Sequence, residues 1–425
     1  MKKLLSTVLA LFAVTSFAAC GNASGGSSNE FTPSLDTNTE CNIKIVGDYE
    51  SFPELLDEFK EFRKYYPNVH LGYSSIPGSE YTDKLAAILE GDKPNIFFSS
   101  TWMLEDDKYE TIVSHMEDLS NPDFKIDLNC IRPGLIKGGN NLMVPLFSRS
   151  YGMLVNNSLF EKEGLNVPSN LNELLTVCNS FKSKGYVSPM MGYSLEAPNS
   201  LMNTIAYPAV VASLANDPIA IELANDLDPK AGAYTLSALS VVEQLAESGA
   251  FDLTECNKIT DNYNKVLLRF LEGDVPMMIC ADDTPSGVKK REDRSEAFIE
   301  HPFTYSYAPI PVGENGGYFV DNPSKLLSVN KHCDNLDMTN EFMRFLVSTK
   351  QLNELAKKKN LISSTKEIFF DSIYAPFGLV PIERTFSPEG LGFKDAIKVQ
   401  IRKLAYKVGI GELSAEEAAN QYGSF

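Results

Sequence analysis

The chain has 425 residues, a hydrophobic content of 43% and a formal net charge of −18 at pH 7. This length allows two globular lobes with separate cores, and the hydrophobic content argues against a disordered chain. Because an acidic protein repels phosphate backbones and anionic lipid, the charge argues against nucleic acid as a partner.

The first residues have the order of an export signal. Lys2 and Lys3 precede a run of apolar or small residues over 4–19, which is short for a membrane span, so we predict a signal peptide over residues 1–19. The first cysteine of the chain, Cys20, stands in Ala18-Ala19-Cys20-Gly21, which is similar to the bacterial lipobox. The similarity implies that Cys20 is lipidated and anchors the protein in the cell membrane. Ordinary secretion is the alternative.

Residues 20–39 are predicted to be the lipidated cysteine and a flexible tether, because Gly/Ser-rich chain has too little apolar surface to offset its conformational entropy. Six further cysteines form no CxxC pair and have no metal-ligand spacing. Cys178 and Cys280 lie in apolar runs and are predicted to be buried thiols, although an even number also permits disulfides outside the cytoplasm. The six are Cys41, Cys130, Cys178, Cys256, Cys280 and Cys333.

The predicted elements begin with a β-α-β unit. Ile43–Val46 is predicted to be a strand, and Val69–Tyr73, which alternates apolar and polar residues, is predicted to be a second one. Between them, Ser51 and Glu54 form the pattern of a capping box, which predicts that a helix begins at Phe52.

The same order of elements then repeats. A helix is predicted up to Leu89, with Gly91 as its left-handed stop, and Ile96–Phe98 is predicted to be a buried strand. Alternating strands and helices indicate a mostly parallel sheet, whose ligands gather at the carboxyl ends of the strands. In this chain those ends are Gly47–Tyr49 and Ser99–Trp102.

The middle of the chain carries the most specific pattern. Its motifs are Val144-Pro145, Val155-Asn156-Asn157, Leu159-Phe160, Gly164-Leu165, Pro168 and Asn172-Glu173-Leu174. Together they resemble the family-1 extracellular solute-binding proteins of ABC importers, relatives of maltose-binding protein. Further landmarks of that family follow in order, among them "FLEGDVPMMICADD" and "LSAEEAANQY", so the resemblance covers the chain from residue 40 to residue 425.

The resemblance implies an α/β fold of the two-lobed periplasmic-binding-protein type, with a hinge and a ligand cleft between the lobes. It implies three crossings of the chain between the lobes, near Ser148, Ser306 and Ser348. The expected lobes are residues 40–147 plus 305–347 for lobe 1 and residues 148–304 plus 348–425 for lobe 2.

The sequence offers little chemistry for catalysis. It contains no HExxH, GxSxG or P-loop motif, and its four histidines are scattered without metal-ligand spacing. Asp282 and Asp283 could be paired carboxylates of a glycosidase, but adjacent strand residues point to opposite faces. We therefore expect a protein that is not an enzyme and that has no cofactor or metal.

The resemblance implies capture of a small polar solute, a mono- or oligosaccharide above all, by hinge closure. The expected partners are this solute, the transmembrane subunits of an ABC permease and, through the lipid anchor, the membrane; the protein itself is expected to be a monomer outside the cytoplasm. Two alternatives stay open: a lipid-anchored carbohydrate-active hydrolase, and an adhesin or scaffold without a ligand.

The expected binding residues lie at strand ends and on loops that the family places at the cleft. Tyr49 and Trp102 offer flat aromatic faces, and Arg149 stands at the first crossing. Burial of Trp102 within its lobe, a salt bridge at Arg149 and a solvated loop over residues 193–199 are the alternatives. The predicted ligand-binding residues are Asp48, Tyr49, Ser99, Trp102, Arg149, Tyr193, Glu196, Asn199, Asp283, Tyr318 and Phe386.

Overall fold

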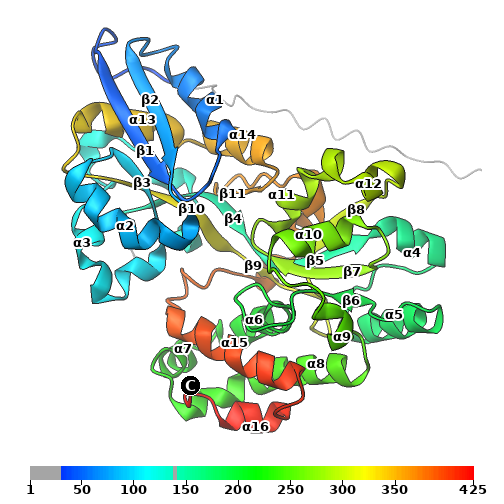
Figure 1. Cartoon of the computed structure of the whole chain (residues 1–425). Coiled ribbons are helices and arrows are strands. Elements are labelled where there is room, and N and C mark those ends of the chain that lie inside the picture. The colour runs from blue at the N-terminus through cyan, green and yellow to red at the C-terminus, as the bar shows by residue number, and fades with distance from the viewer. Residues whose placement is uncertain (1–29, 137–140) are drawn as a thin grey trace, which may run out of the picture.

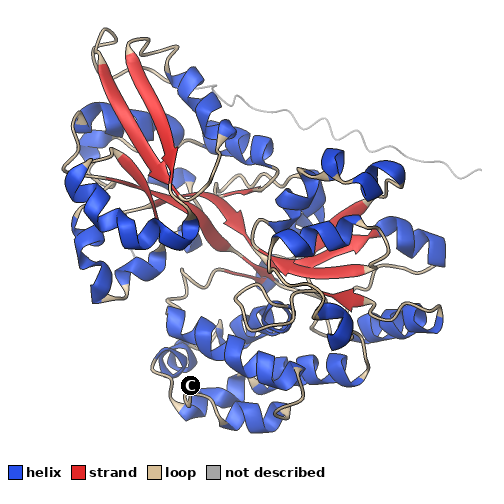
Figure 2. Ribbon diagram, viewed as in Figure 1, coloured by secondary structure: helices blue, strands red, loops and turns tan. Residues whose placement is uncertain are grey.

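The computed structural model describes residues 30–136 and 141–425, which form two α/β lobes (Figures 1 and 2). The sheet of the first lobe has the strand order β11-β4-β10-β3-β1-β2, and that of the second lobe has the order β6-β7-β5-β8. Helices pack on both sides of each sheet (Figure 2). The predicted α/β, two-lobed fold is confirmed, whereas the predicted signal peptide and Cys20 lie outside the described residues.

The first lobe contains the predicted β-α-β unit. β1 pairs in parallel with β2 and β3, and β10 pairs antiparallel with β3 and β4. Each predicted strand is present and slightly longer than expected. The strands are β1 (Cys41–Gly47), β2 (Val69–Ser75), β3 (Ile96–Ser99), β4 (Val144–Arg149), β10 (Asn322–Val329) and β11 (Ile362–Ser363). The helices are α1 (Pro53–Phe62), α2 (Gly78–Gly91), α3 (Glu110–Ser114), α13 (Leu336–Leu346) and α14 (Thr349–Lys359).

The second lobe is richer in helix. Its strands are β5 (Tyr151–Asn156), β6 (Met190–Met191), β7 (Met277–Ala281) and β8 (Tyr305–Ala308). Its helices are α4 (Asn157–Glu163), α5 (Leu171–Ser183), α6 (Leu201–Leu214), α7 (Pro218–Asn225), α8 (Leu236–Glu247), α9 (Leu253–Cys256), α10 (Asn264–Leu271), α11 (Thr284–Lys289), α12 (Glu296–Glu300), α15 (Asp395–Gly409) and α16 (Ala415–Asn420). α6 is apolar on nearly all sides because it is buried between the sheet and helices α8 and α15. Cys178 and Cys280 are buried free thiols, as predicted.

The chain passes between the lobes at three places. β4 runs into β5 with only Ser150 between them, β8 leads through residues 309–321 to β10, and β11 leads through residues 364–394 to α15. Within the last two connections, β9 (Phe319–Val320) and β12 (Thr385–Phe386) pair in parallel, which ties the second crossing to the third.

Two of the three predicted crossings differ from the structure. Ser306 lies inside β8, which pairs with β5 in the second sheet. Ser348 caps α14, and this helix stays with the first lobe because Lys358 Nζ lies 2.8 Å from Glu58 Oε1 of α1. The lobe boundaries therefore fall after β8 and after β11, while the end of β4 lies where the crossing near Ser148 was predicted.

The segment before β1 packs on the first lobe, although its composition predicts a flexible tether. The Phe31 ring lies edge-on to Tyr65 and Phe345, with centroid distances of 5.1 and 5.3 Å. The backbone N–H and the hydroxyl of Ser34 donate to the Glu341 carboxylate at 2.8 and 2.7 Å. Phe31 supplies the apolar surface that the Gly/Ser stretch lacks, so the flexible-tether prediction is wrong for the segment from Phe31 to Ser34.

Two local predictions in this lobe are also wrong. The capping box does not form: Phe52 is the N-cap of α1 and has no side-chain hydrogen bond, because Glu54 accepts instead from Lys290 at 2.7 Å. Gly91 is the last residue of α2, and the left-handed conformation falls on Lys93, whose φ is 44°.

Glu341 is expected to make the stability of the first lobe pH-dependent. Burial would raise the pKa of Glu341, but hydrogen bonds from Arg344, Tyr66 and Ser34 lower it to about 2. This stabilisation is complete above the pKa of 4.5 of the unfolded side chain and is lost as the pH falls toward 2. Glu341→Gln should therefore cost about 2 to 3 kcal/mol of unfolding free energy at pH 7.

Urea unfolding at a series of pH values measures this effect. The Glu341→Gln variant should lose much of the decline in stability between pH 4.5 and 2, whereas Glu354→Gln, on the exposed side of α14, should keep it. Equally steep declines in both variants would contradict the role of Glu341.

Candidate functional site

The carboxyl ends of β1 and β7 meet between the lobes. Tyr49, which follows β1, donates its hydroxyl hydrogen to Asp283 Oδ2, which follows β7, at 2.5 Å. A pocket of about 740 Å³ opens beside this contact and is lined by residues of both lobes, among them Glu54 and Tyr263. Because ligands of α/β sheets bind at the carboxyl ends of strands, this interlobe pocket is the centre of the candidate site.

Tyr49 lines the first-lobe side of the interlobe pocket, and Asp48 precedes it but does not line the pocket. Lys325 Nζ donates to both carboxylate oxygens of Asp48 at 3.0 Å and lies 4.0 Å from the centre of the Tyr49 ring. Burial, together with the negative charge of Asp283, raises the pKa of Tyr49 well above its usual value. Tyr49 therefore stays protonated and acts as a hydrogen-bond donor across the lobes.

Arg149 lies at the first crossing, at the end of β4. Its Nη1 is 2.8 Å from Asp282 Oδ1, and the two side chains are 43% and 32% exposed. The charge of Asp282 raises the pKa of Arg149. The alternative interpretation, a salt bridge between the crossing and the second lobe, is thus what the structure shows. Asp282 adopts a left-handed φ of 61°, and it and Asp283 take different partners.

Of the two predicted residues near the end of β3, the serine is buried within the strand and the tryptophan that follows it is half-buried. Ser99 is buried, with its hydroxyl 2.8 Å from that of Ser328 on β10, so it lies within the sheet and not in the interlobe pocket. Trp102 is partly exposed and packs edge-on to Tyr109 with a centroid distance of 4.8 Å. One side of the indole is therefore fixed by the lobe.

A contact between the lobes involves Glu389, which the sequence analysis missed. Thr101 donates to Glu389 Oε1 at 3.1 Å, and Lys398 of α15 donates to the same oxygen at 3.2 Å. The Glu389 side chain is 3% exposed and its Oε2 has no hydrogen-bond partner among the described residues. No local pattern marks Glu389 in the sequence, because its partners lie elsewhere along the chain.

The loop after β6 carries three predicted residues with different surroundings. Glu196 Oε1 is 3.1 Å from Arg402 Nε of α15, and both side chains are partly exposed. Asn199 donates to the carbonyl oxygen of Asn262 at 2.8 Å, and this hydrogen bond joins two loops of the second lobe. Tyr193 is half-buried and is not among the residues lining the interlobe pocket.

Tyr318 and Phe386 lie together but apart from the interlobe pocket. Their ring centroids are 6.1 Å apart, and both line a pocket of about 430 Å³ formed with α6 and α8. This pocket shares no lining residue with the interlobe pocket. The structure therefore does not bring these two residues to Tyr49 and Asp283.

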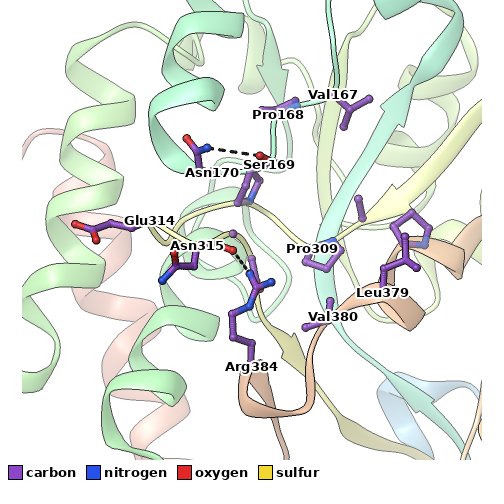
Figure 3. Close-up of a pocket in the computed structure, with 15 residues that line it drawn as sticks. Val167, Pro168, Ser169, Asn170, Pro309, Glu314, Asn315, Leu379, Val380 and Arg384 are labelled. Carbon is purple, nitrogen blue, oxygen red and sulfur yellow. Dashed lines mark hydrogen bonds between the residues drawn. The ribbon is translucent and has the colours of Figure 1, made fainter.

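A further pocket of about 480 Å³ lies where the second and third connections meet (Figure 3). Figure 3 shows Arg384 pointing toward the loop of Asn315, and its Nη1 donates to the carbonyl oxygens of Asn315 and Gly317. The other walls of this pocket include apolar residues such as Pro309 and Leu379 and polar residues such as Asn170 and Glu314. Arg384 thus holds the two connections together, which is a structural role.

Comparison with known proteins identifies the family. The family model described as bacterial extracellular solute-binding protein matches residues 45–352, more than half of the chain. The chain belongs to this family. The family assignment confirms the resemblance found in the sequence and places the protein outside the cytoplasm. Among curated protein sequences, none matches the chain.

Solved structures match nearly the whole chain at low identity and therefore show the fold alone. The GacH receptor of Streptomyces glaucescens has a TM-score of 0.64 and 18% identity, with 91% of this chain and 97% of the receptor covered. The protein RafE in complex with raffinose has a TM-score of 0.64 and 17% identity, with coverages of 90% and 98%. A chitin oligosaccharide binding protein has a TM-score of 0.66 and 15% identity, with coverages of 91% and 98%. No helix within the described ranges is long and apolar enough to cross a membrane.

Proposed function

We propose that the protein is the solute-binding lipoprotein of an ABC importer, which captures a small polar solute, a saccharide above all, between its lobes. The observation that carries the proposal is the interlobe pocket, because its walls include Tyr49 and Glu54 of the first lobe and Tyr263 and Asp283 of the second. A solute in this pocket contacts both lobes at once.

Two observations favour a saccharide. Among the solved relatives, RafE is in complex with raffinose, the GacH receptor is known in complex with acarbose, and the third protein is a chitin oligosaccharide binding protein. In this chain, Tyr49 and Tyr263 place rings at the interlobe pocket, and Arg149 lies at the crossing between the lobes, paired with Asp282. Aromatic faces with a few fixed polar groups are the usual means of holding a sugar ring and its hydroxyls.

The proposed mechanism is hinge closure by a monomer. Contacts that a solute makes with both lobes exist only in the closed form, so binding shifts the equilibrium by the difference in affinity for the two forms. The short link at Ser150 and the β9–β12 pair are the segments about which the lobes would move. The closed, loaded protein then delivers its solute to the transmembrane subunits of the permease, without any catalytic step.

A thermal-shift screen against neutral and acidic mono- and oligosaccharides tests this function. A saccharide present at 100 times its dissociation constant should add about 2.7 kcal/mol to the stability and raise the melting temperature. Arg149→Ala should weaken its binding by about 1 to 3 kcal/mol, because a charged donor at the crossing between the lobes is lost. Arg63→Ala, at an exposed position after α1, is the matched control and should bind normally.

The outcomes separate the alternatives. Release of sugar from a glycan by the purified protein would identify the hydrolase, and no response to any saccharide would reject the sugar proposal. Equal binding by Arg149→Ala and Arg63→Ala would show that Arg149 does not contact the saccharide.

Lipid anchoring is proposed from the Ala-Ala-Cys-Gly junction and is tested separately. Cells that express the full chain and are fed a palmitate analogue should label the wild type, and Cys20→Ala should lose the label. Cys333→Ala should keep it, because this cysteine lies in the first lobe, far along the chain from the junction. The same labelling of the wild type and Cys20→Ala would contradict the anchor.

A further inference from the structure

The charged side chains that line the interlobe pocket are mostly basic, whereas the protein as a whole is acidic. The chain carries a formal net charge of −18, yet more basic than acidic side chains line this pocket. The basic residues are Lys290, Arg291, Arg294 and Lys359, and the acidic residues are Glu50, Glu54 and Asp283. A local excess of positive charge within an acidic protein attracts anions to this position.

Two lysines of the pocket share one carboxylate. Lys290 Nζ lies 2.7 Å from Glu54 Oε1, and Lys359 Nζ lies 3.5 Å from Glu54 Oε2. The side chain of Lys359 is 10% exposed, and its ammonium group lies 4.5 Å from the centre of the Tyr49 ring. Glu54 therefore neutralises at most one of two neighbouring ammonium groups.

The pKa of Lys359 reflects its burial beside a second ammonium group. Burial, with the positive charge of Lys290 adding to it, lowers the pKa of Lys359 to about 8, against the opposing charges of Glu54 and Asp283. A buried ammonium group with too little negative charge around it is stabilised by an added anion.

Arg291 supplies a third cation from the second lobe. Its Nη2 donates to Asn264 Oδ1 at 3.0 Å, and the guanidinium lies 5.9 Å from the centre of the Tyr263 ring. Both partners are uncharged, and the ion pairs of residues 30–136 and 141–425 do not include Arg291. The guanidinium is thus held in place while its charge stays available.

We infer that the interlobe pocket binds an anionic group of the solute, a carboxylate, sulfate or phosphate, between Lys359 of the first lobe and Lys290 and Arg291 of the second. This inference rests on the proposed function and narrows its solute to acidic saccharides. Because the cations come from both lobes, one anion between them draws the lobes together.

Calorimetric titration with sodium sulfate, at constant ionic strength set with sodium chloride, tests the anion site without any sugar. The wild type should bind sulfate saturably, and Lys359→Met should bind at least about tenfold more weakly because one of the three cations is removed. Lys357→Met, which removes an exposed lysine of the same helix, should bind within about twofold of the wild type. Lys359→Met is expected to fold because Glu54 keeps Lys290. Arg291→Gln provides a second variant that leaves the lysine pair intact.

Equal sulfate binding by the wild type, Lys359→Met and Arg291→Gln, or no saturable binding, would overturn the anion site. A second titration compares digalacturonate with its neutral methyl ester. Tighter binding of the acid, lost in Lys359→Met and kept in Lys357→Met, supports the inference, and equal binding of acid and ester overturns it while leaving the sugar proposal intact. Sulfate binding that depends on Lys359, with no response to any saccharide, supports the anion site and rejects the sugar proposal.

Discussion

The geometry of the site depends on how β4 runs into β5. Arg149 is the last residue of β4 and pairs with Asn322 in the first sheet, while Tyr151 begins β5 and pairs with Ala281 in the second. Ser150, the single residue between them, is buried, and its carbonyl oxygen accepts a hydrogen bond from Tyr307 at 3.0 Å. Strand pairing on either side of Ser150 thus fixes both sheets relative to this residue. The carboxyl ends of β7 and β1 lie close enough for the hydrogen bond between Asp283 and Tyr49.

The ion pairs around Ser150 contribute little to folding, so a solute can replace their contacts at small cost. Arg149 pairs with Asp282, and Lys325 pairs with Asp48, in side chains that are partly exposed. Ion pairs of this kind contribute about 0 to 1 kcal/mol each to folding. The folded protein therefore loses little stability when a solute replaces one of their contacts. Lys359 differs because it is buried and shares its carboxylate with a second lysine. The region between the lobes therefore combines partly exposed ion pairs with a buried lysine that shares its carboxylate with a second lysine.

The sequence predicted the parts of the structure that depend on local pattern. The strands before and after α1 and the carboxyl-end position of Tyr49 follow from alternation and from the β-α-β order, and the structure has both. Ser99 was assigned to the site because it follows a predicted strand, but β3 includes it and Ser328, far along the chain, bonds its hydroxyl. Glu389 and Lys359 carry no local signal, because their importance comes from partners on other elements. Contacts between distant segments therefore account for most of what the sequence did not predict about the site.

Small-angle X-ray scattering tests most directly whether one solute binds both lobes across the hinge. The protein is measured alone and with a saturating concentration of the saccharide that raises its melting temperature most. Closure about the Ser150 link predicts a smaller radius of gyration in the loaded protein, because the lobes approach each other. A scattering profile that is unchanged at saturation would contradict binding between the lobes by closure.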